Sequence, residues 1–238
     1  QAMAARSRLL VAEARALLAP PGFDPAESRR SFRLAASDYA VMALVPVLLT
    51  DLNRAAPHLH LTLRPVGTGT LVALREGGLE MSFWAGALPE GPFLLQPLFT
   101  ETLTGLCPPG HAFAQGPVAV EDWAAAPHVA VSLGDPGVNP VEQALAQSGL
   151  RRRVALVSPS FAGAMAALAA GGMVMALPRR LLPMALAQEL RPFDLPIPLP
   201  PYPYGLLRHQ ATRDDPGIGW LAARIAAAAP EPAQGPLR

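Results

Sequence analysis

Strand-like and helix-like segments alternate along this chain, and their order is what most restricts its fold. Residues 31–37 form a short apolar run, residues 38–56 have helical spacing, and residues 58–66 alternate leucines with polar residues, as a half-exposed strand does. A Gly-bounded turn with a short helix over 67–78 and a strand over 79–86 follow. This β-α-β-α-β order predicts a parallel sheet covered by helices.

A second block of the same kind follows two strands that we predict at 94–99 and 102–107. The second block's predicted strands and helices cover 128–133, 141–147, 151–158, 159–172, 173–177 and 178–188, and a late strand over 204–211 precedes a closing helix over 215–229. Because the second block repeats the alternation of the first, we predict an α/β protein with two units in series.

The composition is that of a globular domain without a nucleic-acid surface. Of 238 residues, 51% are hydrophobic and 16% are charged, and the net charge of +1 lacks the basic excess of a nucleic-acid-binding face. The single cysteine, Cys107, excludes a disulfide within the chain and a cysteine-based zinc site, and fits a reducing compartment. No apolar run reaches about 18 residues, so the sequence predicts no membrane span.

The two ends of the chain differ from the rest. Residues 1–20 have the spacing of an amphipathic helix, which "PPG" at Pro20–Gly22 ends. Charged residues at Arg8, Glu13 and Arg15 break the apolar run that a signal peptide requires. The Pro- and Gly-rich residues 231–238 predict a disordered tail.

Motifs for catalysis or cofactor binding are missing from the sequence. It contains no GxGxxG after a strand, no GxxxxGK[ST], no GxSxG and no HExxH, and it has no lysine for a Schiff base. His58 and His60 lie two apart on a predicted strand, but no third metal ligand is near them in the sequence. We therefore predict neither an enzyme nor a protein with a metal or another cofactor.

Polar and aromatic residues follow several predicted strands, and these residues are the candidate ligand-binding positions. In open α/β sheets, ligands bind beyond the carboxyl ends of the strands. The candidates at a strand end or at the turn or helix start that follows are Ser37, Thr68, Thr70, Trp84, Ser132 and Phe161. A seventh candidate, His209, lies on the late strand itself. Each has a structural alternative: a helix cap for the hydroxyls, a core or supporting role for Trp84 and Phe161, and a structural hydrogen bond for His209. We expect Asp38 to cap its own helix.

Five segments have an order and spacing typical of one known family: "RSFRLAASDYAVMALVPVLLTDLNRAAPHLHLTLRPV", "GTGTLVALREGGLEMSF", "LTGLCPPGHAFA", "SFAGAMAALAAGGMVMALPRRL" and "LLRHQATRDDPGIGWLAARI". In this order they resemble the effector-binding portion of LysR-type transcriptional regulators. The chain departs from the family at His111-Ala112-Phe113, which lacks the usual proline, and at Arg208, where the subgroup of nodulation-gene and aromatic-degradation regulators often has Trp.

This resemblance implies the fold. It implies two Rossmann-like lobes with a cleft between them, of the type II periplasmic-binding-protein kind, preceded by a linker helix over residues 1–20. Lobe one would cover residues 32–105 and 207–230, and lobe two residues 106–206. From the resemblance we expect that the family's N-terminal winged helix-turn-helix is absent from this sequence.

The resemblance also implies a function. A small-molecule effector, either aromatic or a small organic acid, would bind in the cleft and shift the conformation of a homodimer or homotetramer in the cytoplasm. DNA would be contacted only through the absent N-terminal domain. The alternative is a periplasmic-type solute-binding protein for a small polar or aromatic compound, which would share the two-lobe architecture and would have to be exported.

Overall fold

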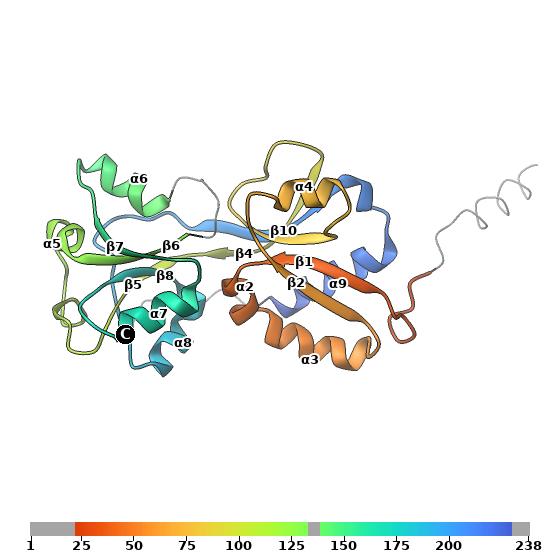
Figure 1. Ribbon diagram of the computed structural model, residues 1–238, viewed down its shortest axis with the longest axis horizontal. Helices are drawn as coiled ribbons and strands as arrows, with labels where there is room; N and C mark the ends of the chain where they lie inside the picture. Colours follow the sequence, from red (N-terminus) through yellow and green to blue (C-terminus); the bar gives the residue numbers. More distant parts are fainter. Residues whose placement is uncertain (1–21, 133–138, 230–238) are drawn as a thin grey trace, which may run out of the picture.

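The computed structural model describes residues 22–132 and 139–229, which form two α/β lobes lying side by side (Figure 1). The expected linker helix over residues 1–20 and the expected tail over residues 231–238 lie outside the described residues. Within the described ranges, no helix is both long enough and apolar enough to span a bilayer.

Lobe one is built on a five-stranded sheet with the order β2-β1-β3-β10-β4. Its strands are β1 (Ser31–Ala36), β2 (His60–Pro65), β3 (Met81–Ala85), β4 (Phe93–Glu101) and β10 (Tyr202–His209). β1 pairs in parallel with both β2 and β3, as the alternating pattern predicted, and the late strand β10 runs antiparallel between β3 and β4.

Alternate residues of a strand point to opposite sides of the sheet, and here the residues on both sides are apolar. Helices therefore cover both faces of this sheet. On one face, Leu34 and Leu206 join the core with α3 (Val45–Ala55) and α9 (Pro216–Ala228). On the other face, the next residues, Ala35 and Leu207, pack with α4 (Thr70–Arg75) through Leu74.

The helix that we expected over residues 38–56 is two helices. α2 (Asp38–Ala43) ends at Leu44, whose φ of −120° is not helical, and α3 begins directly afterwards. Pro46 lies at the first turn of α3, where its missing N–H is not needed, whereas within one continuous helix it would remove a hydrogen bond. The break separates α2 from α3, and α2 contacts α7 and the short 3-10 turn Arg179–Leu181.

Lobe two contains a three-stranded sheet, β8-β5-β9, and a parallel pair, β6-β7. Its strands are β5 (Leu103–Cys107), β6 (Pro127–Val131), β7 (Arg153–Ser158), β8 (Met175–Pro178) and β9 (Arg191–Phe193), and its helices are α5 (Val120–Ala125), α6 (Pro140–Gln147), α7 (Phe161–Ala169) and α8 (Leu182–Ala187). Short 3-10 turns η1 (Ala112–Ala114), η2 (Arg179–Leu181) and η3 (Gln210–Thr212) complete the described elements.

β9 and α5 are elements that the sequence patterns did not predict, and β9 has only three residues. It pairs with β5 where Gly105 faces Phe193. A Cβ on Gly105 would lie 2.4 Å from the Phe193 ring, so glycine is required for this strand to approach.

The strand pairing also bears on where the lobes divide. β5 pairs from Leu103 with strands of lobe two, and β10 pairs from Tyr202 with strands of lobe one. We therefore propose crossovers near residues 102 and 201, in place of the expected 105–106 and 206–207. β4 and β10 lie next to these crossovers, in the middle of the molecule (Figure 1).

Candidate functional site

Two adjacent cavities lie where the lobes meet. The inner one, of about 150 Å³, has residues of both lobes in its wall. Its lining residues are Ser37, Tyr39, Val66, Phe83, Trp84, Ala85, Phe161, Pro178, Tyr202 and Tyr204. The six aromatic residues among these make it an apolar, ring-lined space with a few hydroxyl groups.

The outer cavity is larger, about 780 Å³, and more open. Lobe one supplies the C-terminal end of β2 and the start of α2, and lobe two supplies Ser132, Val157 and Pro159. Ser37 and Val66 line both cavities. The two cavities thus share a wall at the carboxyl ends of β1 and β2, where ligands bind in open α/β sheets.

Aromatic side chains pack closely around Tyr204. Its ring stacks on Phe99 with centroids 5.2 Å apart, and Tyr39 meets it edge-on at 5.0 Å. Tyr39 also meets Phe161 of lobe two edge-on at 6.2 Å. One apolar cluster therefore continues from lobe one into lobe two.

A fully buried carboxylate, Glu101, lies beneath these rings. The Tyr39 hydroxyl donates a hydrogen bond to Glu101 Oε2, and Arg180 Nη1 of η2 lies 3.7 Å from Glu101 Oε1. The Arg180 guanidinium also lies 3.9 Å from the centroid of Phe99. The Thr102 N–H donates a hydrogen bond of 2.8 Å to Glu101 Oε1. Because a lone buried charge is very costly, these partners together allow Glu101 to be buried there.

The tyrosines of this site are neutral. Burial raises the pKa of Tyr39, and the hydrogen bond to Glu101 raises it further. Burial likewise raises the pKa of Tyr202 and of Tyr204. Their hydroxyl groups therefore act as neutral donors and acceptors at physiological pH.

Asp38 joins the two lobes. Its Oδ2 accepts a hydrogen bond of 2.9 Å from the backbone N–H of Ala162, in the first turn of α7. Our expectation that Asp38 caps its own helix is wrong, because this carboxylate caps a helix of the other lobe. Ser37 does not cap α2 with its side chain either.

Four of the predicted ligand residues line these cavities. Ser37, Trp84 and Phe161 line the inner cavity, and Ser37 and Ser132 line the outer one. The Trp84 indole N–H is directed to the Ala87 carbonyl at 2.9 Å. This leaves the face of its ring as the part available to a ligand.

The other three predicted residues line neither cavity. Thr70 is buried and accepts a hydrogen bond of 3.0 Å from the Gly67 N–H, which fastens the turn before α4. Thr68 is exposed in that turn. His209 accepts the Ala211 N–H at 3.3 Å and begins η3. For these residues, ligand binding stays a prediction that the geometry does not favour.

Several residues of the site were missed by the sequence analysis. Tyr39, Tyr202, Tyr204 and Glu101 come together from α2, β10 and β4, which are far apart in sequence. Two signals were present: "PYPYG" places two tyrosines at strand spacing, and "FTE" ends an apolar strand with a carboxylate. The pairing of Glu101 with Tyr39 depends on the tertiary fold and has no local signal.

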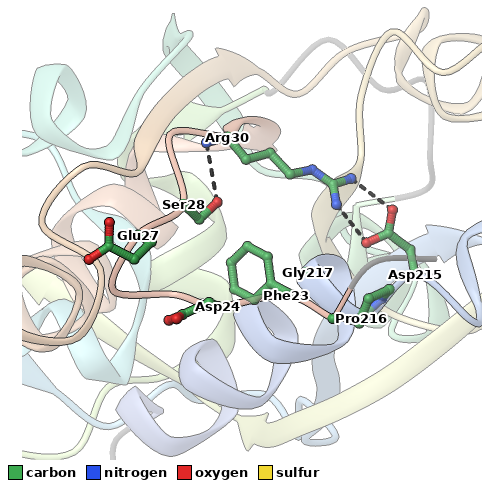
Figure 2. Close-up of a pocket in the computed structure, with 9 residues that line it drawn as sticks. Phe23, Asp24, Glu27, Ser28, Arg30, Asp215, Pro216 and Gly217 are labelled. Atoms are coloured by element: carbon green, nitrogen blue, oxygen red, sulfur yellow. Dashed lines mark hydrogen bonds and ion pairs between the residues drawn. The ribbon is translucent and has the colours of Figure 1, made fainter.

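A third cavity, of about 460 Å³, lies in lobe one, away from the cleft (Figure 2). Arg30 donates two hydrogen bonds, of 2.7 and 2.8 Å, to the Asp215 carboxylate at the start of α9. Asp24 accepts the Ala26 N–H, and Ser28 accepts the Arg30 N–H. The bonds from Arg30 to Asp215 fasten the segment before β1 onto the start of α9, and the other two are local bonds within that segment.

Comparisons with known proteins agree with this architecture. Residues 25–230 match the family described as the LysR substrate binding domain. The HTH-type transcriptional activator NagR of Ralstonia sp is 30% identical over 214 residues, which are 87% of this chain and 69% of that protein. The HTH-type transcriptional regulator SyrM of Rhizobium meliloti (strain 1021) is 30% identical over 208 residues, 86% of this chain and 64% of SyrM. The chain thus spans about two thirds of the length of these curated relatives.

Solved structures have the same fold. The probable transcriptional regulator PA0477 from Pseudomonas aeruginosa superposes with a TM-score of 0.77 and 27% identity, over 93% of this chain and 74% of that one. The regulatory domain of MexT, a transcriptional activator in Pseudomonas aeruginosa, has a TM-score of 0.73 at 24% identity, over 84% and 98% of the two chains. This second likeness concerns the fold alone.

These relatives are transcriptional regulators, and neither an enzyme nor a solute-binding protein is among those named here. They support a regulator over the alternative of a solute-binding protein, and the family is not enzymatic. With its two-lobe fold and its family match over residues 25–230, the chain belongs to the LysR-type transcriptional regulators and contains their substrate-binding domain.

Proposed function

We propose that this domain senses a small aromatic effector, which binds between the lobes and so changes how the whole regulator acts on transcription. One observation carries the proposal: a small cavity with aromatic walls receives residues from both lobes. A ligand there touches both lobes at once. Its binding free energy therefore depends on how the lobes are placed.

The size of the inner cavity fits one aromatic ring. An apolar cavity of about 150 Å³ is known to hold a benzene-sized molecule. Rings pack well edge-on or offset against Tyr39, Phe161 and Tyr204, and such pairs contribute about 0.5–1.5 kcal/mol each beyond burial. The outer cavity has room for a substituent or a second ring.

The effector acts by shifting an equilibrium between lobe arrangements. Asp38 and Phe161 already connect the lobes in the arrangement described here. A ligand favours one arrangement only by its difference in affinity for the two, and a complete reversal of populations requires about 10⁴-fold. An effector that touches both Trp84 of lobe one and Phe161 of lobe two is suited to provide such a difference.

A thermal-shift screen of single-ring and two-ring aromatic compounds tests the proposal. An effector at about 100 times its dissociation constant stabilises the folded domain by about 2.7 kcal/mol. For a domain of this size that raises Tm by roughly 5–10 °C. If aliphatic acids or sugars raise Tm and no aromatic compound does, the proposed effector class is wrong.

We also propose that copies of the chain associate as a homodimer or homotetramer. β7 pairs with β6 on one side only within the described sheets, and its Leu156 and Val157 are 38% and 59% exposed. On α3, Val47 is 57% exposed. An apolar edge strand favours pairing with, or burial against, a second chain.

Light scattering tests this interface. The variant Val157→Lys should have a smaller molar mass in solution than the unaltered chain, and an equal mass for both would place the interface elsewhere.

We propose that DNA is contacted by a part of the regulator outside residues 25–230, the region that matches the family. The named relatives are called HTH-type, and the chain spans 69% and 64% of their lengths. The chain itself has a net charge of only +1. A regulator that acts on DNA in a bacterial cell works in the cytoplasm, which is where we place this protein.

A further inference from the structure

Asp38, which lines the outer cavity, has one carboxylate oxygen without a hydrogen-bond partner among the described residues. Its Oδ2 is taken by the Ala162 N–H, whereas its Oδ1 is buried and has no hydrogen-bond partner among the described residues. The residue lines the outer cavity next to Ser37, which lines both cavities. A buried acceptor without a donor costs about 1–3 kcal/mol, so a ligand that supplies the donor recovers that free energy.

Two backbone N–H groups at the start of α7 are already engaged by the protein's own side chains. The first turn of a helix offers free N–H groups and the positive end of a helix dipole. Here the Ala162 N–H donates to Asp38, and the Gly163 N–H donates to Ser160 Oγ at 3.0 Å. A negatively charged ligand would have to displace the protein's own carboxylate or lie beside it.

The charges around the cleft also disfavour an anion. None of the ten lining residues of the inner cavity is charged, and the outer cavity has one carboxylate, Asp38, and one cation, Arg64, which is exposed. Glu101 is buried beneath the rings. A desolvated carboxylate facing another carboxylate is strongly disfavoured, whereas the faces of aromatic rings attract cations and donors.

From these contacts we infer that the effector is an aromatic compound carrying a neutral or cationic hydrogen-bond donor, not a carboxylate, and that Asp38 sets this preference. The inference rests on the proposed function, since it concerns the ligand of the same cleft. An amide, amino or hydroxyl substituent of the effector would donate a hydrogen bond to Asp38 Oδ1.

Three probes with the same ring test the inference: benzamide, benzylamine and benzoate. Benzamide and benzoate have nearly the same shape and differ in charge and in donors, and near neutral pH benzylamine is a cation. Ligand-observed NMR titrations of the chain should give dissociation constants for benzamide or benzylamine at least about tenfold lower than for benzoate.

The matched variant is Asp38→Asn, which has the same shape and can still accept the Ala162 N–H. Without the negative charge, the discrimination against benzoate should fall to within about threefold. Asp122→Asn removes an exposed carboxylate on α5 and should keep the tenfold preference. Should Asp38→Asn fold poorly, Asp38→Ser removes the same charge with a smaller side chain and should reduce the discrimination in the same way.

The outcomes separate this inference from the proposed function. Benzoate binding as tightly as benzamide, or an unchanged preference in both Asp38 variants, overturns the inference while leaving the aromatic cleft in place. If no probe binds and the aromatic screen gives no thermal shift, the cleft does not bind rings, and both conclusions are overturned. The expected result is that benzamide or benzylamine binds more tightly than benzoate to the unaltered chain and to Asp122→Asn. This preference should be lost in Asp38→Asn and Asp38→Ser.

Discussion

The Tyr39 hydroxyl donates its hydrogen bond to Glu101, a carboxylate with no exposed surface at the end of β4. Tyr39 belongs to α2, and Glu101 lies next to the crossover that we propose near residue 102. This bond therefore connects α2 to that crossover. Arg180 approaches the same carboxylate from lobe two. The polar core of the cleft therefore joins α2 and β4 of lobe one to η2 of lobe two.

Tyr39→Phe should lower the free energy of unfolding by about 1–3 kcal/mol, because Glu101 loses a donor in a place that water does not reach. Urea unfolding of Tyr39→Phe, Glu101→Gln and the double variant measures the coupling between the two side chains. We expect a coupling of at least about 0.5 kcal/mol. Additive effects of the two substitutions would mean that the bond adds nothing to stability.

Two glycines of α9 should respond in opposite ways to alanine. At Gly217 a Cβ would lie 2.7 Å from Arg30 Nη1 and 3.0 Å from the Phe23 ring, so Gly217→Ala should destabilise the domain by about 1–3 kcal/mol. At Gly219 nothing lies within 4 Å, and Gly219→Ala should stabilise it by about 0.5–1 kcal/mol. Thermal unfolding of both variants checks the packing in Figure 2. Equal effects at the two positions would contradict it.

The Arg30–Asp215 pair should stabilise the domain only while Asp215 is charged. The hydrogen bond from Arg30 lowers the pKa of Asp215 below its ordinary value of 3.8. The stabilisation is therefore present above about pH 4 and is lost as the pH falls through the lowered pKa. Asp215→Asn keeps a helix cap but removes the charge, and both side chains are about a third exposed, so the cost should be at most about 1 kcal/mol.

Unfolding measured at neutral pH and in acid tests this pair. The difference between the unaltered chain and Asp215→Asn should disappear in acid. Asp214→Asn, the exposed neighbour, is the control and should change little at either pH. A difference that persists in acid would show that Asp215 acts through something other than its charge.

His128 should make lobe two less stable in mild acid. Burial lowers the pKa of His128 below its ordinary value of 6.5, and its Nε2 lies 2.7 Å from the Trp123 carbonyl. Below about pH 6.5 the unfolded chain binds a proton that the folded chain does not, so stability falls with falling pH until the lowered pKa is reached. The slope is at most about 1.4 kcal/mol per pH unit.

His128→Gln should remove that slope, whereas His58→Gln, at an exposed histidine, should leave it unchanged. Urea unfolding between about pH 7.5 and pH 5.5 measures it. An undiminished slope in His128→Gln would assign the acid sensitivity to another group.

The sequence was informative where the chain's own periodicity decides the structure. The alternation in 31–86 predicted the parallel β1, β2 and β3, and the position of Ser37 after β1 predicted a residue of the cleft wall. The break at Leu44 was missed because Pro46 is equally acceptable in a first helical turn, and the sequence does not say which turn that is. Asp38 has the signature of a local cap, and only the approach of α7 gives it a partner in the other lobe.

The aromatic walls of both lobes provide the most direct test of the account. We would measure by calorimetry how tightly the best aromatic ligand binds to the unaltered chain and to Trp84→Leu in lobe one, Phe161→Leu in lobe two and Phe113→Leu, whose side chain lines a separate cavity of lobe two. The account predicts that both cleft variants weaken binding by about tenfold or more while Phe113→Leu does not. Binding that is unchanged in both Trp84→Leu and Phe161→Leu would contradict it.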